Sequence, residues 1–171
     1  MGFEKSTYEA VTKISSPKLM RDWMLITAGK EGSYNTMLAS WGGIGVLWGG
    51  PVAFIFVRDS RHTKKFVDKS ECFSLSFFND EYKDALYLCG TVSGRDRDKV
   101  HEAGLTPVYA EHTTYFEQAA IVFNCRKLSE TLIPLEDVLD RSIIERFYDD
   151  SDCHTMYIGE IEEVLINTDQ L

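Results

Sequence analysis

Six stretches of the chain carry the apolar patterns of β-strands. Cys72–Phe78 alternates large and small side chains with a period of two, as a strand with one buried face does. Val52–Val57 is apolar throughout, which indicates a strand covered on both faces. The turn Gly29–Gly32 joins two of the stretches into a hairpin. The predicted strands are Trp23–Ala28, Tyr34–Trp41, Val52–Val57, Cys72–Phe78, Phe116–Leu128 and Met156–Ile166.

Helical patterns are short and lie between these strands. They cover Thr63–Lys69, Asp80–Leu88, Asp96–Ala103 and Leu135–Phe147, with Asp80 predicted as an N-cap. The strands do not alternate with helices at the spacing of βαβ units, so a doubly wound parallel sheet is disfavoured. The pattern predicts a mostly antiparallel β-barrel with helices at its rim.

The chain has 171 residues, 44% of them hydrophobic and 26% charged, which is ordinary for a globular protein. This length predicts one domain, residues 1–171, with a single core. The sequence contains no apolar run of the roughly 20 residues that a membrane helix needs. Its first ten residues, MGFEKSTYEA, lack the apolar core of a signal peptide. We therefore expect a cytoplasmic protein that does not bind membranes.

The four cysteines are widely spaced and form no CxxC pair: Cys72, Cys89, Cys125 and Cys153. A zinc or iron–sulfur site normally shows at least one close pair, and disulfides are rare in a reducing compartment. We expect buried free thiols and no metal site.

A net charge of −9 argues against nucleic-acid binding, which requires clustered basic surface. Against this acidic background, residues 58–65 hold four Lys or Arg side chains and one histidine, opposed only by Asp59. Arg58, Arg61, Thr63 and Lys64 can supply charge-assisted donors to a phosphate, helped by a helix that begins at Thr63. The alternative is that Lys64 and Lys65 form an ordinary solvated helix face.

The small-residue strand before this patch can approach a flat ligand closely. Backbone N–H groups over Thr36, Met37, Ala39 and Ser40 can reach ring atoms, and Asn35 and Ser40 add side-chain donors. Tight packing in the core is the alternative reading of the same residues. Trp41 ends this strand and can pack beside a ring, and a Gly-rich turn leads from it to Val52–Val57. A heteroaromatic ring with a phosphate tail fits this layout, and flavin mononucleotide (FMN) is the leading candidate.

Six segments, taken together and in this order, resemble the flavin reductase-like, or flavoredoxin-like, proteins of the FMN-binding split barrel. The resemblance extends from about residue 20 to about residue 165. Pyridoxamine-phosphate oxidases share the barrel, but the first and last segments favour the flavin reductase branch. The segments are N-T-M-L-A-S-W (35–41), P-V-A-F-I-F-V-R (51–58), R-H-T-K (61–64), F-S-L-S-F-F (73–78), S-G-R-D-R-D-K (93–99) and H-T-M-Y-I-G-E-I (154–161).

The resemblance implies a six-stranded antiparallel split barrel that forms a homodimer with FMN near the interface. It also implies that Asn35, Trp41, Thr63, Lys99 and His154 contact the flavin, with Ser93 as a weaker candidate. From the residues alone, His154 also fits a structural role, and the 93–99 segment also fits an N-capped helix whose Asp96 and Arg97 form charge pairs.

The first functional hypothesis is a flavin reductase, in which NADH or NADPH passes a hydride to FMN and the electrons continue to free flavin or another acceptor. A flavoredoxin-like electron carrier that holds FMN permanently and exchanges electrons with a redox protein is the alternative. A flavin- or anion-binding module without electron transfer is the third possibility. The sequence contains neither a GxGxxG after a strand nor a P-loop, so a nicotinamide cofactor is expected to stack directly on the flavin.

Overall fold

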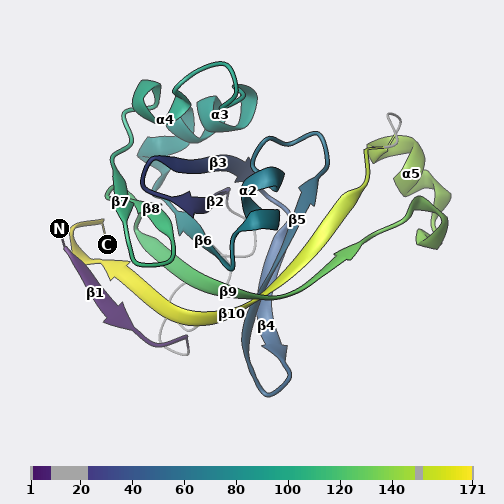
Figure 1. The fold of residues 1–171 in the computed structure, drawn as a ribbon, viewed down its shortest axis with the longest axis horizontal. Helices are drawn as coiled ribbons and strands as arrows, with labels where there is room; N and C mark the ends of the chain where they lie inside the picture. The colour runs from purple at the N-terminus through teal and green to yellow at the C-terminus, as the bar shows by residue number, and fades with distance from the viewer. Residues whose placement is uncertain (1, 9–22, 149–151, 171) are drawn as a thin grey trace.

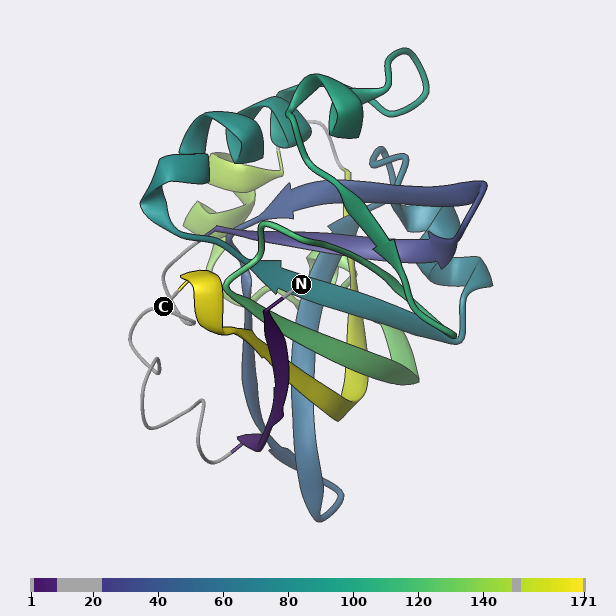
Figure 2. The same cartoon turned by 90° about the vertical axis from the view of Figure 1, so that its left-hand side faces the viewer.

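The computed structural model describes residues 2–8, 23–148 and 152–170, and its centre is one antiparallel sheet of eight strands (Figure 1). Seven of them follow the order β3-β2-β6-β9-β10-β5-β4, and β1 pairs with the C-terminal half of β10. Figure 2 shows β1 beside the last strand. The strands are β1 (Phe3–Ser6), β2 (Met24–Lys30), β3 (Ser33–Ala39), β4 (Gly42–Leu47), β5 (Gly50–Arg58), β6 (Cys72–Phe77), β9 (Ile121–Leu132) and β10 (His154–Asn167).

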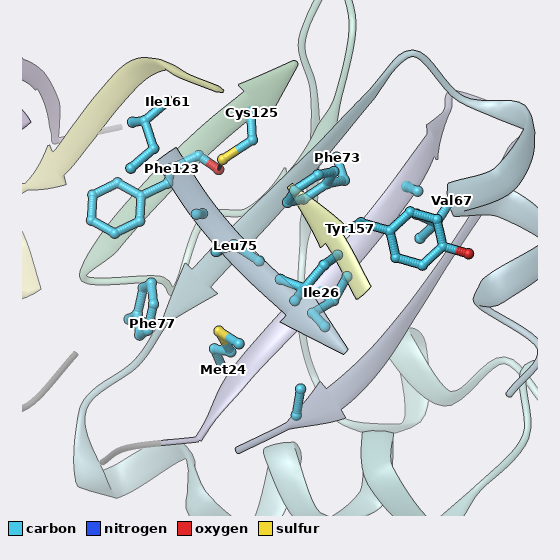
Figure 3. Close-up of a cluster of buried hydrophobic side chains, with 14 of the residues drawn as sticks. Met24, Ile26, Val67, Phe73, Leu75, Phe77, Phe123, Cys125, Tyr157 and Ile161 are labelled. Atoms are coloured by element: carbon cyan, nitrogen blue, oxygen red, sulfur yellow. Dashed lines mark hydrogen bonds between the residues drawn. The ribbon is translucent and has the colours of Figure 1, made fainter. Parts of the chain in front are cut away.

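The sheet is curled, and its inner face encloses one apolar cluster. This cluster contains buried side chains from six strands: β2, β3, β5, β6, β9 and β10. Figure 3 shows this cluster, in which Ile26, Phe73, Leu75, Phe123 and Tyr157 are almost fully buried. Burial of large apolar side chains is the main favourable term in folding. The six predicted strands are these six, so the mostly β antiparallel fold with few helices is confirmed.

The helices lie at the rim of the sheet. They are α2 (Lys64–Lys69), α3 (Lys83–Thr91), α4 (Lys99–Glu102) and α5 (Arg141–Phe147). Helix α3 packs on β3, and a second apolar cluster, with Leu86 and Phe116, fills the space beneath it. Figure 1 shows α5 at the far end of the long β9 and β10 strands. No helix in the described ranges is long and apolar enough to cross a membrane.

The helix boundaries differ from the prediction in three places. The predicted helix Leu135–Phe147 is a 3₁₀ turn at Leu135–Asp137 followed by the shorter helix α5. Residues 80–82 form a 3₁₀ turn, so Asp80 lies inside it and Asn79 precedes it. Helix α4 begins only at Lys99, because the Asp98 carboxylate accepts a hydrogen bond from the His101 N–H and caps the helix there. Arg97 pairs with Glu102 across this start instead of taking part in a longer helix.

Four short strands were missed by the pattern analysis, among them β4, in the predicted Gly-rich turn. Its glycines still pair in register with β5, from Gly42 opposite Ile55 to Leu47 opposite Gly50. The actual turn is the pair Trp48-Gly49, and both residues have positive φ, as a two-residue hairpin turn requires. The other three are β1, β7 (Pro107–Tyr109) and β8 (Thr114–Phe116).

The cysteines are free thiols. Cys72, Cys89 and Cys125 are buried as predicted, whereas Cys153 is only partly buried. Burial raises the pKa of Cys89 to about 11, which keeps this thiol protonated and unreactive near neutral pH.

Candidate functional site

Two adjoining cavities form one elongated groove along the outer side of β3. The larger, about 390 Å³, lies between the end of β3, the end of β5 and the start of β10. The smaller, about 210 Å³, lies between β3, the turn before α2 and the loop from α3 to α4. Met37, Ser60 and Arg61 line both. The antiparallel register places His154 directly opposite Arg58, so the ends of β5 and β10 meet at the groove.

The smaller cavity is the cationic end of the groove. Arg61, Arg95 and Lys99 line it together with hydroxyl and amide side chains, and none of its lining residues in the described ranges is Asp or Glu. The Arg61 guanidinium donates a hydrogen bond to the Gly90 carbonyl over 3.0 Å, which holds this flexible side chain across the hollow. Such a donor set suits a phosphate, which binds most strongly to charged donors.

Lys99 is the most unusual of these cations, because its side chain is buried, with 5% of the residue exposed. Its ammonium donates one hydrogen bond, to the Cys89 carbonyl over 2.9 Å. No ion pair joins it to a carboxylate of residues 2–8, 23–148 or 152–170. Burial lowers the pKa of Lys99, and the Arg61 guanidinium lowers it further. Burying a charge without a counter-ion costs free energy of desolvation. A bound anion would offset this cost for the Lys99 ammonium.

The wall of the cationic end is tightly built. Asn35 donates from its side-chain nitrogen to the Thr63 hydroxyl over 2.7 Å, which ties β3 to the start of α2. Both residues are buried. A Cβ on Gly94 would lie 2.0 Å from the Asn35 side-chain oxygen. Glycine is therefore required at position 94 for the α3–α4 loop to approach β3 this closely.

Aromatic side chains form the other end of the groove. The Trp41 and His154 rings lie 5.1 Å apart, centroid to centroid, and Phe147 packs edge-on against Trp41 at 5.2 Å. Phe56 adds another ring to the lining. Trp41 is 42% exposed although two rings contact it. A flat ligand therefore finds an aromatic surface there that is open to solvent on one side.

His154 is held in one orientation by Tyr148, whose hydroxyl lies 2.8 Å from the imidazole Nδ1. Burial lowers the pKa of His154, and the Arg58 guanidinium lowers it further. The imidazole is therefore neutral at pH 7. Burial also raises the pKa of Tyr148, which keeps its hydroxyl protonated. The tautomer of the neutral imidazole sets which of the two groups donates in this contact.

Strand β3 is an edge strand, since β2 is its single partner in the described sheet. Every second backbone N–H and C=O of an edge strand points away from its partner. Met37, Ala39 and Ser40 line the groove on this free side. Alternate backbone groups along this edge are thus free of a strand partner, and their donation to a ligand ring stays a prediction of the small-residue pattern.

The groove brings together most of the residues predicted for the site. Its lining includes Asn35, Met37, Ala39, Ser40, Trp41, Arg58, Arg61, Thr63, Ser93, Lys99 and His154.

Two predicted residues lie elsewhere. The Thr36 hydroxyl is fully buried and donates to the Ile26 carbonyl over 3.2 Å, on the β2 side of the strand. Lys64 forms ion pairs with Asp68 at 3.1 Å and Asp59 at 3.5 Å and lines neither cavity of the groove. The basic patch is therefore split: Arg58 and Arg61 face the groove and Lys64 does not.

Sequence reasoning missed Phe56, Arg95 and Tyr148. Arg95 lies in the S-G-R-D-R-D-K segment, four residues before Lys99, and its guanidinium donates to the His62 Nδ1 over 3.2 Å. Its position in a polar loop was the available signal. Phe56 belongs to an apolar strand, and Tyr148 follows α5. No pattern marks either as a site residue, because only the fold brings Phe56 to the groove and Tyr148 to His154.

The sequence matches the family described as flavin reductase like domain over residues 18–171. The chain belongs to the flavin reductase-like family. No curated protein matches it.

Solved structures show the same fold at low sequence identity. A flavoredoxin from Methanosarcina acetivorans is 20% identical, with a TM-score of 0.70 over 88% of this chain and 71% of that one. An FMN-binding domain of a flavin reductases-like enzyme from Shewanella baltica OS155 is 14% identical, with a TM-score of 0.70 over 97% and 78%. Nitrilotriacetate monooxygenase component B from Bacillus cereus is 18% identical, with a TM-score of 0.66 over 97% and 79%. At these identities the likeness establishes the split-barrel fold.

Proposed function

We propose that this family member binds FMN in the groove, with the phosphate at the cationic end and the isoalloxazine ring at the aromatic end. The observation that carries the proposal is the buried ammonium of Lys99, which lines a cavity without a carboxylate among its described lining residues. Thr63, Ser93, Arg61 and Arg95 provide further donors around the same hollow. Together they fit a dianionic phosphate.

The aromatic end supplies what the ring needs. In this proposal the outward-facing backbone N–H groups of the β3 edge donate to ring oxygens and nitrogens, where negative charge gathers on reduction. The Trp41 and Phe56 side chains exclude water from one side of the ring. The His154 imidazole adds a polar group at the mouth, oriented by its contact with the Tyr148 hydroxyl.

The reaction we propose is flavin reduction by NADH or NADPH. When bound, FMN supplies a two-electron acceptor, and the nicotinamide supplies the hydride. The contribution of the chain is to hold two flat rings in parallel, because hydride transfer depends on alignment. The partial exposure of Trp41 leaves this end of the groove open to a second ring. His154 is neutral and is assigned to orientation, not to proton transfer.

Anaerobic spectroscopy of the FMN-loaded protein tests this reaction. We expect the visible flavin absorbance to bleach on addition of NADH or NADPH, and the faster donor identifies the preferred nucleotide. Bleaching by a reduced ferredoxin but by neither nucleotide would contradict hydride transfer and indicate the electron-carrier alternative. A bound flavin that accepts electrons from none of these donors would indicate a binding module.

A homodimer is part of the proposal. The β4–β5 hairpin projects beyond the curled sheet (Figure 1), and Val46 and Trp48 on it are 71% and 67% exposed. Large exposed apolar side chains close together mark interaction surfaces. A second copy of the chain that covers this hairpin would bury both side chains.

A further inference from the structure

Helix α2 carries two charged i,i+4 pairs of opposite character. Lys64 and Asp68 form an ion pair that also contacts the Tyr157 side chain. Lys65 and Lys69 are two like charges one turn apart, and neither forms an ion pair with a described residue. Like charges at this spacing destabilise a helix. The second pair therefore costs stability that the fold does not recover by internal pairing.

The two lysines line a further cavity of about 660 Å³, which shares His62 with the lining of the groove. Lys30, at the end of β2, is a third ammonium in its lining and likewise forms no ion pair with the described residues. Glu71 is the one carboxylate among the lining residues. On a protein of net charge −9, this is a concentrated positive site.

An aromatic wall accompanies the cations. The His62 ring packs edge-on against Phe66 with centroids 5.2 Å apart, and both rings line the cavity. The His62 Nδ1 accepts a hydrogen bond from the Arg95 guanidinium. Burial lowers the pKa of His62, and the charges of Arg95 and Lys65 lower it further, so this ring is neutral at pH 7. It offers a flat surface between two cationic regions.

We propose that this cavity is a second ligand site, separate from the flavin groove, and that it binds a nucleoside diphosphate. Its volume falls in the range of small-molecule sites, roughly 300–1,000 Å³. Ammonium groups are effective point-charge binders of phosphate. Three unpaired ammonium groups match the charge of a diphosphate, and the His62 and Phe66 rings offer a stacking surface for the base.

Isothermal titration calorimetry with ADP tests the proposal. We expect one ADP per chain, with an affinity that weakens as salt is added, and weaker binding of both adenosine and pyrophosphate. The double variant Lys65→Ala/Lys69→Ala should lower ADP affinity at least tenfold. Lys5→Ala/Lys83→Ala is the matched control, because it removes the same charge from two exposed lysines that pair with Glu163 and Asp80.

The variant Arg61→Ala separates the two sites, because Arg61 lines the groove and not this cavity. We expect it to bind ADP as the wild type does. ADP binding that is lost in Arg61→Ala but kept in Lys65→Ala/Lys69→Ala would place the nucleotide in the groove and overturn the proposal. Equal losses in the cavity variant and in the matched control would also overturn it, as would pyrophosphate binding as tight as that of ADP.

Discussion

The buried ammonium of Lys99 supports the proposal that the groove binds an anion. Its single hydrogen bond, to the Cys89 carbonyl, leaves its charge without a counter-ion in the described structure. Desolvation of an ammonium costs several kcal/mol unless an anion compensates it. The side chain is therefore expected to lower the stability of the protein without ligand and to raise its affinity for phosphate.

The variant Lys99→Met tests this expectation in the flavin-free protein. Removing the buried charge should raise the free energy of unfolding by at least about 1 kcal/mol, more than the lost hydrogen bond costs. Urea denaturation measures the difference, with the exposed Lys83→Met as control. A destabilised Lys99→Met protein would mean that the fold itself satisfies the ammonium.

His154 makes a prediction about pH. Burial and Arg58 lower its pKa in the folded protein, whereas the unfolded chain titrates near the ordinary value of about 6.5. The folded state then binds fewer protons than the unfolded state below pH 6.5. The contribution of His154 to the free energy of unfolding is therefore full above pH 6.5 and is lost as the pH drops toward the lower pKa of the folded state.

We expect the unfolding free energy to fall between pH 7 and pH 5.5 in the wild type and to fall less in His154→Gln. Urea titrations at the two values measure this slope, and His112→Gln changes an exposed histidine as control. Part of the slope should remain in His154→Gln, because the pKa of His62 is lowered too. Identical slopes in wild type and His154→Gln would refute the assignment.

At the scale of elements, helix α2 shows what a linear pattern conceals. Residues 58–65 form one basic patch in the sequence, but the turn at residues 59–62 and the helix that follows distribute it over three surroundings. Arg61 faces the groove, Lys64 pairs with Asp68, and Lys65 faces the second cavity. The anion site that composition predicts stays a prediction, and the contacts of Lys64 give no support for assigning this residue to it.

The β4–β5 hairpin carries an element-scale prediction. Trp48 has a φ of 51°, a left-handed conformation that is unfavourable for a bulky residue. Asparagine suits this turn position much better, so Trp48→Asn should keep the fold.

If Trp48 contributes to the dimer, Trp48→Asn should raise the dimer dissociation constant at least tenfold. Truncation of a central interface tryptophan typically costs about 2 kcal/mol of binding free energy. Sedimentation velocity over a range of concentrations measures it. Tyr87→Asn, on α3 and at a side chain that is 61% exposed, is the comparison. An unchanged oligomeric state in Trp48→Asn would exclude the hairpin from the interface.

For the whole molecule, the strands could be predicted because burial imposes a readable period on them. Strand β4 could not, because its pairing with β5 outweighs five glycines between residues 42 and 50 that indicate a turn. The sequence predicted most of the residues that line the groove but did not predict its shape. Asn35, Arg61, Lys99 and His154 lie far apart in the sequence, and the packing of α3 against β3, with α4 against α3, brings the first three together.

The central claim is that the cationic end of the groove binds the phosphate of FMN. The most direct test compares FMN with riboflavin, which lacks the phosphate, by quenching of flavin fluorescence in wild type and Lys99→Met. We predict that the wild type binds FMN at least about 100-fold more tightly than riboflavin, as two charge-assisted hydrogen bonds would give. This difference should shrink in Lys99→Met. Equal affinities for the two flavins, or binding of neither, would contradict the claim.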